Sequence, residues 1–104
     1  MKDQLDKAWD MFYQECNFPI YRAIDGIFYS NITRTEVDIE TARSVITLTI
    51  EDIILRKFGY SLSSNENTYE WRKGEHDVFF GLERDRLGSA MLVLEQLIMK
   101  EAKK

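Results

Sequence analysis

The chain has 104 residues, a net charge of −4, and 44% hydrophobic and 31% charged residues. This composition is typical of one folded domain spanning residues 1–104, and not of a disordered or membrane protein. Residues 1–52 hold five Lys or Arg against ten Asp or Glu, so a nucleic acid, which requires a basic stripe, is not an expected partner. There is no signal-peptide pattern, and Cys16 is the single cysteine, which excludes an internal disulfide and favours a cytoplasmic location.

The first predicted element is an amphipathic helix over residues 3–16. Its apolar side chains recur at helical spacing, and the acidic residues near its start interact favourably with the helix dipole. The apolar stripe consists of Leu5, Ala8, Trp9, Phe12 and Cys16.

Residues 19–32 permit two interpretations. Asn17 as a cap, Pro19 in a first turn and the apolar stripe that follows indicate a helix. In contrast, Asp25-Gly26 between two apolar segments is a strong signal for a β-hairpin. The helix would place Gly26 in its interior at a cost of about 1 kcal/mol. We favour the helix and keep the hairpin as the alternative.

A long helix is predicted over residues 36–58. Thr35 and Asp38 resemble a capping pair at its start, and Gly59 is suited to end it. One apolar stripe consists of Ile39, Ala42, Ile46, Ile50 and Ile53, and a second of Val45, Leu48 and Leu55. A helix that is apolar on two sides is either central in its domain or buried against another chain, such as a second copy in a homodimer. The alternating segment 46–50 also fits a strand, but the length of the whole pattern favours the helix.

Residues 63–67 have the polar, turn-prone composition of a loop. Two short strands, 69–72 and 77–82, then predict an antiparallel hairpin. The last element is a helix from Asp85 to the end of the chain, with an apolar stripe of Leu87, Ala90, Met91, Leu94, Leu97 and Ile98. The predicted fold is therefore α+β and predominantly helical, with three to four helices around a long central helix and one short antiparallel β-hairpin.

The chain lacks the residues that most catalytic and metal sites require. One His and one Cys exclude a zinc site built from several such ligands. Cys16 lies on an apolar stripe and His76 in a turn, so a Cys–His nucleophile is not expected. Acidic residues at a helix start are better explained as caps than as Mg²⁺ or Ca²⁺ ligands. We expect no enzyme activity, no catalytic residue, no metal and no cofactor.

The apolar surface exceeds what a small domain can bury, because the long helix is apolar on two sides. In addition, Phe79 and Phe80 are neighbours in a predicted strand and therefore point to opposite faces of the hairpin. Such a surplus is typical of an interface with another protein, in which aromatic and Arg residues are the usual anchors. The predicted contact residues are Tyr69, Trp71, Arg72 and Phe79, with Glu36, Asp38 and Glu40 as an acidic patch that faces a basic partner surface.

The predicted function is a non-enzymatic protein-binding module, such as a small inhibitor, an immunity-type protein or an adaptor. The alternative is a small-molecule or nucleotide-binding protein with a pocket between the hairpin and the helices, in which Arg84 or Arg86 anchors an anionic group. A carboxylate-based metal enzyme is a third and weaker interpretation.

Overall fold

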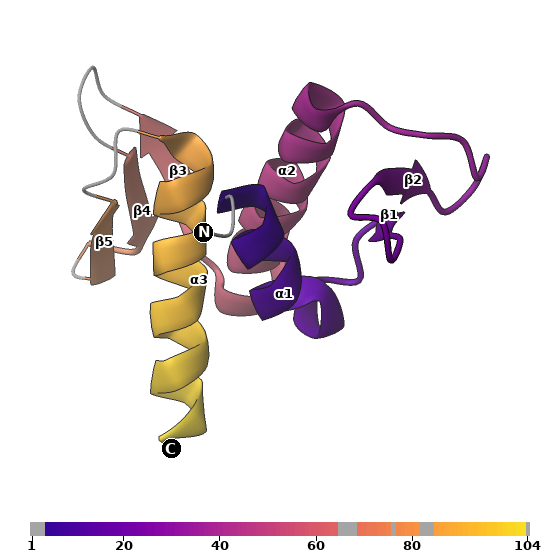
Figure 1. Cartoon of the computed structure of the whole chain (residues 1–104). Helices are drawn as coiled ribbons and strands as arrows, with labels where there is room; N and C mark the ends of the chain where they lie inside the picture. Colours follow the sequence, from indigo (N-terminus) through magenta and orange to yellow (C-terminus); the bar gives the residue numbers. More distant parts are fainter. Residues whose placement is uncertain (1–3, 65–68, 76, 82–84, 104) are drawn as a thin grey trace. The chain divides into compact units, whose positions relative to one another are not determined.

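The computed structural model describes every residue except 1–3, 65–68, 76, 82–84 and 104. The described residues form an α+β fold with three helices, a two-stranded sheet and a three-stranded sheet, both antiparallel (Figure 1). The chain divides into two compact units, Met1–Thr49 and Ile50–Lys104, and the boundary falls inside the second helix. That the two units together form the single domain predicted from composition stays a prediction.

The first unit begins with helix α1, Gln4–Cys16, which confirms the predicted helix. Four of the five residues of the predicted stripe are buried, while Trp9 is half-buried. The helix ends where Asn17 adopts a left-handed conformation, with a φ of 49°, and Asn is one of the few residues that tolerates it. Asn17 therefore ends α1 and does not cap a following helix.

The helix favoured for residues 19–32 is wrong, because this segment forms a hairpin. Strands β1, Ile20–Arg22, and β2, Phe28–Ser30, pair antiparallel. The turn between them needs Gly26 at a φ of 86°, a conformation that glycine adopts without strain. The Asp25 carboxylate accepts a hydrogen bond of 2.9 Å from the Ile27 N–H. The Asp25-Gly26 signal thus outweighs the helical spacing of the apolar residues.

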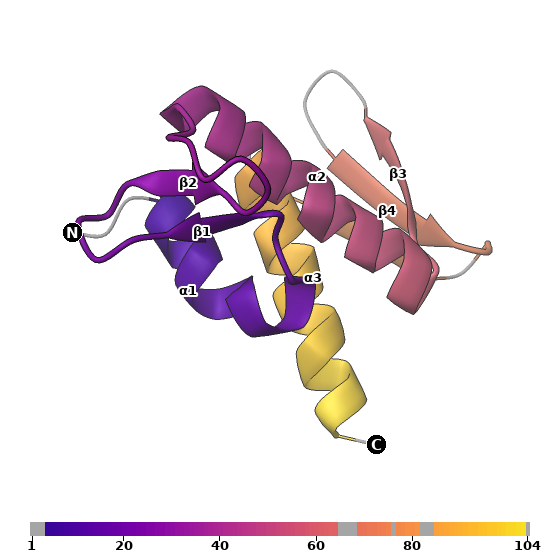
Figure 2. The same ribbon diagram turned by 90° about the vertical axis from the view of Figure 1, so that its right-hand side faces the viewer.

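One face of this hairpin is buried in the first unit, where β1 and β2 lie across α1 (Figure 2). Ile20 and Phe28 are 4% and 5% exposed. The Trp9 ring of α1 contacts the rings of Phe18 and Phe28, with centroids 5.6 and 5.9 Å apart. Arg22 donates a 2.9 Å hydrogen bond to Asp6 of α1. The aromatic contacts and this ion pair fix the hairpin on the helix.

Helix α2, Ile39–Phe58, confirms the predicted long helix, with a later start. Asp38 alone caps it, since its carboxylate accepts a 2.6 Å hydrogen bond from the Thr41 N–H; the predicted role of Thr35 is wrong. Thr47 and Thr49 satisfy their hydroxyls on backbone carbonyls four residues earlier, so the β-branched segment 46–50 is accommodated in a helix. Gly59, with a φ of 81°, ends the helix as predicted, and its N–H bonds the Leu55 carbonyl.

The buried stripe of α2 differs from the predicted one at both ends. Ile39 is 63% exposed, and Ile54 replaces Ile53 as a fully buried residue; the stripe is Ala42, Ile46, Ile50 and Ile54. Each four-residue step overshoots one helical turn by about 40°, so the buried stripe winds around α2, whereas the predicted set, with mixed steps of three and four residues, stays closer to one side. In the second stripe Val45 is half-buried, while Leu48 and Leu55 are 56% and 49% exposed.

The second unit contains a sheet of three antiparallel strands: β3, Ser61–Ser64, β4, Tyr69–Lys73, and β5, Asp77–Gly81. β4 lies in the middle and confirms the predicted hairpin with β5. Strand β3 was not predicted. Ser63 and Ser64 were assigned to a loop, but they pair with Glu70 and Tyr69 of β4, because the neighbouring strand satisfies their backbone groups. The rest of the predicted loop lies outside the described residues.

Helix α3, Arg86–Ala102, confirms the predicted last helix. Its N-cap is Asp85, whose carboxylate accepts a 3.0 Å hydrogen bond from the Gly88 N–H. α3 packs on β5 and β4, so the sheet is covered within its own unit, as a small sheet requires. Among the described residues, no helix combines the length and apolar character needed to cross a membrane.

Candidate functional site

The outer face of the β1–β2 hairpin carries a pair of tyrosines. Tyr21 and Tyr29 are opposite each other in the strand register, and their rings stack with centroids 5.6 Å apart and planes at 21°. Successive residues of a strand point to opposite faces, so the tyrosines lie on the face opposite to the buried Ile20 and Phe28. Both tyrosines are partly exposed, which leaves ring area for another molecule.

The negative charges of two carboxylates act on the Tyr29 phenol. The pKa of Tyr29 is raised above its usual 10.0, first by the negative charge of Asp25, then by loss of hydration, and further by Glu36 and Tyr21. Glu36 reaches this position because its backbone pairs with that of Tyr29 in an isolated bridge. We name Tyr21, Asp25, Tyr29 and Glu36 the tyrosine–acid surface.

The predicted acidic patch of Glu36, Asp38 and Glu40 lies at the entrance to α2, and all three residues are exposed. Their roles differ. Glu36 belongs to the tyrosine–acid surface, Asp38 caps α2, and Glu40 lies in the first turn of α2. The pKa of Asp38 is lowered, first by the backbone hydrogen bond from Thr41. Asp38 and Glu40 thus serve the helix start as well as adding negative charge.

Exposed aliphatic side chains border the same hairpin. Ile24 and Ile27 in its turn are 109% and 37% exposed, and Ile32 in the following loop is 87% exposed. Exposed Arg34 is the basic residue of that loop. The segment therefore joins acidic, aromatic and aliphatic groups, a mixture typical of protein interfaces.

Sequence reasoning missed Tyr21, Asp25 and Tyr29 as site residues, because the helix interpretation of residues 19–32 separates them. The available signal was the hairpin alternative. With Asp25-Gly26 as the turn, Tyr21 and Tyr29 are expected on neighbouring strands, where cross-strand aromatic pairs form.

The structure gives the four predicted contact residues of the second unit different roles. Trp71 has no exposed surface, so its ring cannot contact a partner, and we withdraw it from the predicted contacts. Arg72 is exposed and pairs with Glu70. Tyr69 is half-buried, with its ring centroid 6.3 Å from that of Trp71. The backbone of Phe79 pairs with that of Trp71, and its side chain lies outside the described residues.

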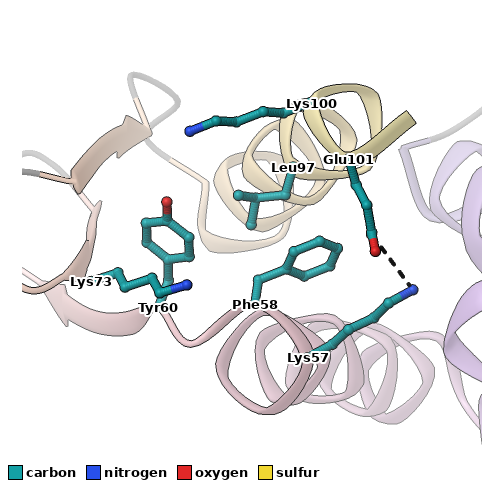
Figure 3. Close-up of a pocket in the computed structure, with 7 residues that line it drawn as sticks. All are labelled: Lys57, Phe58, Tyr60, Lys73, Leu97, Lys100 and Glu101. Atoms are coloured by element: carbon teal, nitrogen blue, oxygen red, sulfur yellow. Dashed lines mark ion pairs between the residues drawn. The ribbon is translucent and has the colours of Figure 1, made fainter. Parts of the chain in front are cut away.

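A hollow of about 300 Å³ lies between the ends of α2, β4 and α3 in the second unit (Figure 3). Its polar lining residues are Lys57, Lys73, Lys100 and Glu101. Lys57 pairs with Glu101 at 3.9 Å. The alternative prediction expected a pocket between hairpin and helices with an arginine as its anion anchor, whereas the cations of this hollow are lysines.

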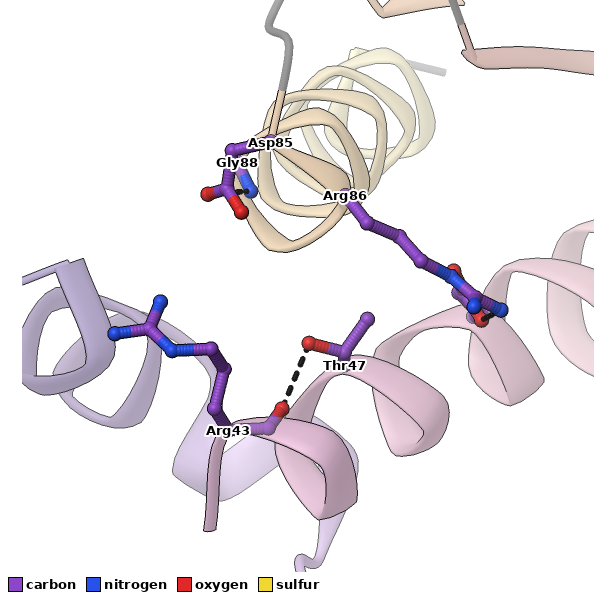
Figure 4. Close-up of polar contacts among 6 residues, drawn as sticks. Arg43, Thr47, Asp85, Arg86 and Gly88 are labelled. Atoms are coloured by element: carbon purple, nitrogen blue, oxygen red, sulfur yellow. Dashed lines mark hydrogen bonds and ion pairs between the residues drawn. The ribbon is translucent and has the colours of Figure 1, made fainter. Parts of the chain in front are cut away.

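The two arginines predicted as anion anchors do not line this hollow. Arg86 forms a two-pronged ion pair with Glu51 of α2, with N–O distances of 2.6 and 2.7 Å, beside the Asp85 cap of α3 (Figure 4). The hydrogen bond with Glu51 is the first cause that raises the pKa of Arg86. Its guanidinium is thus engaged by a carboxylate of the same unit. Arg84 lies outside the described residues.

No group of three His, Cys, Asp or Glu residues in the described ranges is placed to hold a metal ion. Cys16 is 4% exposed on α1, and His76 lies outside the described residues. No family model matches the chain, and no curated protein or solved structure matches it either. What the chain does is therefore inferred from its own residues.

Proposed function

We propose that this chain is a non-enzymatic protein-binding module of the inhibitor, immunity or adaptor kind, which binds a basic segment of another protein through the tyrosine–acid surface. The observation that carries this proposal is the stacked Tyr21–Tyr29 pair, with Glu36 bridged to Tyr29 through the backbone and Asp25 in the turn of the same hairpin. The opposite face of the same hairpin is buried on α1, so the surface is supported by packed structure.

The chemistry of this surface suits Arg and Lys side chains. A guanidinium or ammonium group is attracted to the face of a tyrosine ring by about 0.5–1 kcal/mol at an exposed site. A nearby carboxylate adds a charge-assisted hydrogen bond. The exposed Ile24 and Ile27 of the turn offer apolar contact for the stems of the same side chains. A basic segment with some apolar character therefore satisfies every group of the surface.

We also propose α2 as the central helix of the fold. In the first unit Arg43 of α2 donates a 3.1 Å hydrogen bond to Gln4 of α1. In the second unit Glu51 of α2 pairs with Arg86 of α3. One helix thus contacts a different helix in each unit. A cytoplasmic location is part of the same proposal, because the single, buried Cys16 suits a reducing compartment.

A second candidate is a homodimer formed through α2. Leu48 and Leu55 are seven residues apart in the helix and about half-exposed, and a seven-residue repeat places side chains on one side of a helix. Light scattering distinguishes the two: a dimer whose mass falls to that of one chain in Leu48→Glu favours this candidate, and a monomer at all concentrations contradicts it.

The test of the main proposal is capture of the partner from the native host by the whole chain, followed by mass spectrometry. The variant carries Asp25→Asn and Glu36→Gln, which remove two charges from the surface; the amide introduced by Asp25→Asn keeps an oxygen that can accept the turn hydrogen bond. The matched control carries Asp52→Asn and Glu95→Gln, two exposed acids of the second unit. The net charge changes equally in both.

We expect the wild type and the control to capture the same lysine- or arginine-rich protein and the surface variant to lose at least about tenfold of it, in line with two charge-assisted contacts. The captured amount should also fall as salt rises, because the charges are exposed. Equal capture by the surface variant and the control would contradict the proposal.

A further inference from the structure

The hollow of the second unit is positively charged. It contains three lysines and one glutamate, all from the second unit: Lys57 from α2, Lys73 from β4, and Lys100 and Glu101 from α3. The ion pair between Lys57 and Glu101 is 3.9 Å long, and both side chains are more than half-exposed. The attraction between the two charges is therefore weak. Among the side chains that the structure describes, which do not include that of Asp77 on the neighbouring strand, neither Lys73 nor Lys100 has a carboxylate within ion-pair distance.

Favourable interaction with a helix end accounts for the positions of two of these lysines, but not for the position of the third. Lys57 and Lys100 lie in the last turns of α2 and α3, where a cation interacts favourably with the negative end of the helix dipole. Lys73 ends a strand and has no such role. Bringing a third ammonium group to the same hollow costs electrostatic energy, and an anion in the hollow would offset that cost.

Local packing holds Lys73 at the hollow. Its Nζ lies 5.9 Å from the centroid of the Tyr60 ring, within reach of a cation–π contact. Its Cε is 3.4 Å from the point where a Cβ on Gly59 would lie, so the stem passes close over the glycine that ends α2. In Figure 3 Lys73 and Lys100 approach the hollow from opposite sides of Tyr60.

The remaining lining residues form an apolar wall. Tyr60 and Leu97 are buried and Phe58 is half-buried, all beside the lysines. A volume of about 300 Å³ is at the lower end of the range for small-molecule pockets. Three lysines and one glutamate give this hollow a charge of +2, which matches the charge near −2 of a phosphate monoester at neutral pH.

We propose that this hollow binds a small phosphate monoester with one flat aromatic group, whose phosphate contacts Lys73 and Lys100 and whose aromatic group packs on Phe58 and Tyr60. Lysine is a common phosphate ligand that acts as a point charge. This site is independent of the tyrosine–acid surface, because every lining residue belongs to the second unit.

The test is an NMR titration of the ¹⁵N-labelled whole chain at low salt, with phenyl phosphate, adenosine monophosphate and inorganic phosphate as separate probes. The variants are Lys73→Gln, Lys100→Gln and Glu101→Gln. The matched control is Lys7→Gln, which removes one exposed lysine charge from α1. Lys73, Lys100 and Glu101 are exposed, so their substitution leaves the core unchanged.

We expect the amides of Gly59 and Tyr60 to shift with both esters, and inorganic phosphate to bind at least threefold more weakly because it lacks a ring. Lys73→Gln and Lys100→Gln should each weaken ester binding about tenfold, Lys7→Gln should leave it unchanged, and Glu101→Gln should tighten it by releasing Lys57. The proposal is overturned if no amide near the hollow shifts at millimolar ester, if inorganic phosphate binds as tightly as the esters, or if Lys7→Gln weakens binding as much as Lys73→Gln.

Discussion

At the residue scale, Tyr29 belongs to both the aromatic pair and the acidic group of the tyrosine–acid surface. Its ring stacks on Tyr21, and its phenol lies near the charges of Asp25 and Glu36. An aromatic ring beside two carboxylates is a suitable site for a cation, since both groups attract positive charge. The same charges disfavour the phenolate, so the arrangement can be tested by measuring the pKa of Tyr29.

We predict that Tyr29 ionises at a higher pH than the usual 10.0, because neighbouring negative charge opposes formation of the phenolate. Since the folded-state pKa is raised, the folded chain binds this proton more tightly, and stability is lost as pH rises from 10.0 through the raised value. The measurement is an NMR pH titration of the Tyr29 ring carbon. Asp25→Asn should lower its pKa more than Glu36→Gln. Identical titrations in all three proteins would show that these carboxylates do not act on Tyr29.

At the element scale, hydrogen bonds at the helix ends determine where helices start and stop. Asp38 and Asp85 each accept a hydrogen bond from an N–H three residues on, and Gly59 ends α2 in a left-handed conformation. Caps of this kind depend on a few consecutive residues, so helix ends can be predicted from the local sequence alone.

We predict that Asp85→Ala destabilises the chain by about 1 kcal/mol, in the range of about 0.5–2 kcal/mol for the loss of an N-cap. Asp85→Asn is the control, because asparagine caps a helix about as well as aspartate. Urea unfolding followed by circular dichroism measures both. Equal destabilisation by Ala and Asn would mean that the carboxylate charge, and not the cap, stabilises this end of α3.

The elements that could be predicted from sequence are those with long apolar periodicity or a defined cap. Helices α1, α2 and α3 have such signals, and the β4–β5 hairpin has a different one, two short strand-like segments on either side of a turn. Strand β3, with the sequence Ser-Leu-Ser-Ser, has none, since its pairing is determined by the neighbouring strand β4. Residues 19–32 carry two conflicting local signals, and the burial of Ile20 together with the contact of Phe28 with Trp9 of α1 favours the hairpin. The candidate surface depends on that hairpin register, so it could not be predicted before the hairpin was known.

At the scale of the whole molecule, burial distinguishes the two sides of α2. Ile46 has no exposed surface, while Leu48 is 56% exposed two residues later. We predict that Ile46→Ala costs about 2–5 kcal/mol of unfolding free energy, as for other buried aliphatic truncations. Leu48→Ala, the matched control on the same helix, should cost less than about 1 kcal/mol. Thermal and urea unfolding measure both, and equal losses would place Leu48 in a buried interface.

The single-domain prediction can be tested with the two tryptophans, since Trp9 lies in the first unit and Trp71 in the second. In Trp9→Phe, fluorescence reports on Trp71, whereas circular dichroism reports on all helices. We predict coincident unfolding curves, because α2 runs through both units and cannot unfold in one without losing hydrogen bonds in the other. Two separated transitions would mean that the units unfold independently.

The most direct test of the proposed binding surface is an NMR titration of the ¹⁵N-labelled chain with a short arginine-rich peptide, compared with the same peptide carrying glutamine in place of arginine. We predict that the arginine peptide shifts the amides of Tyr21, Tyr29 and Glu36, and that the glutamine peptide does not. Shifts centred on the β4–β5 hairpin, or none at β1 and β2, would contradict the tyrosine–acid surface as the site that binds a basic partner.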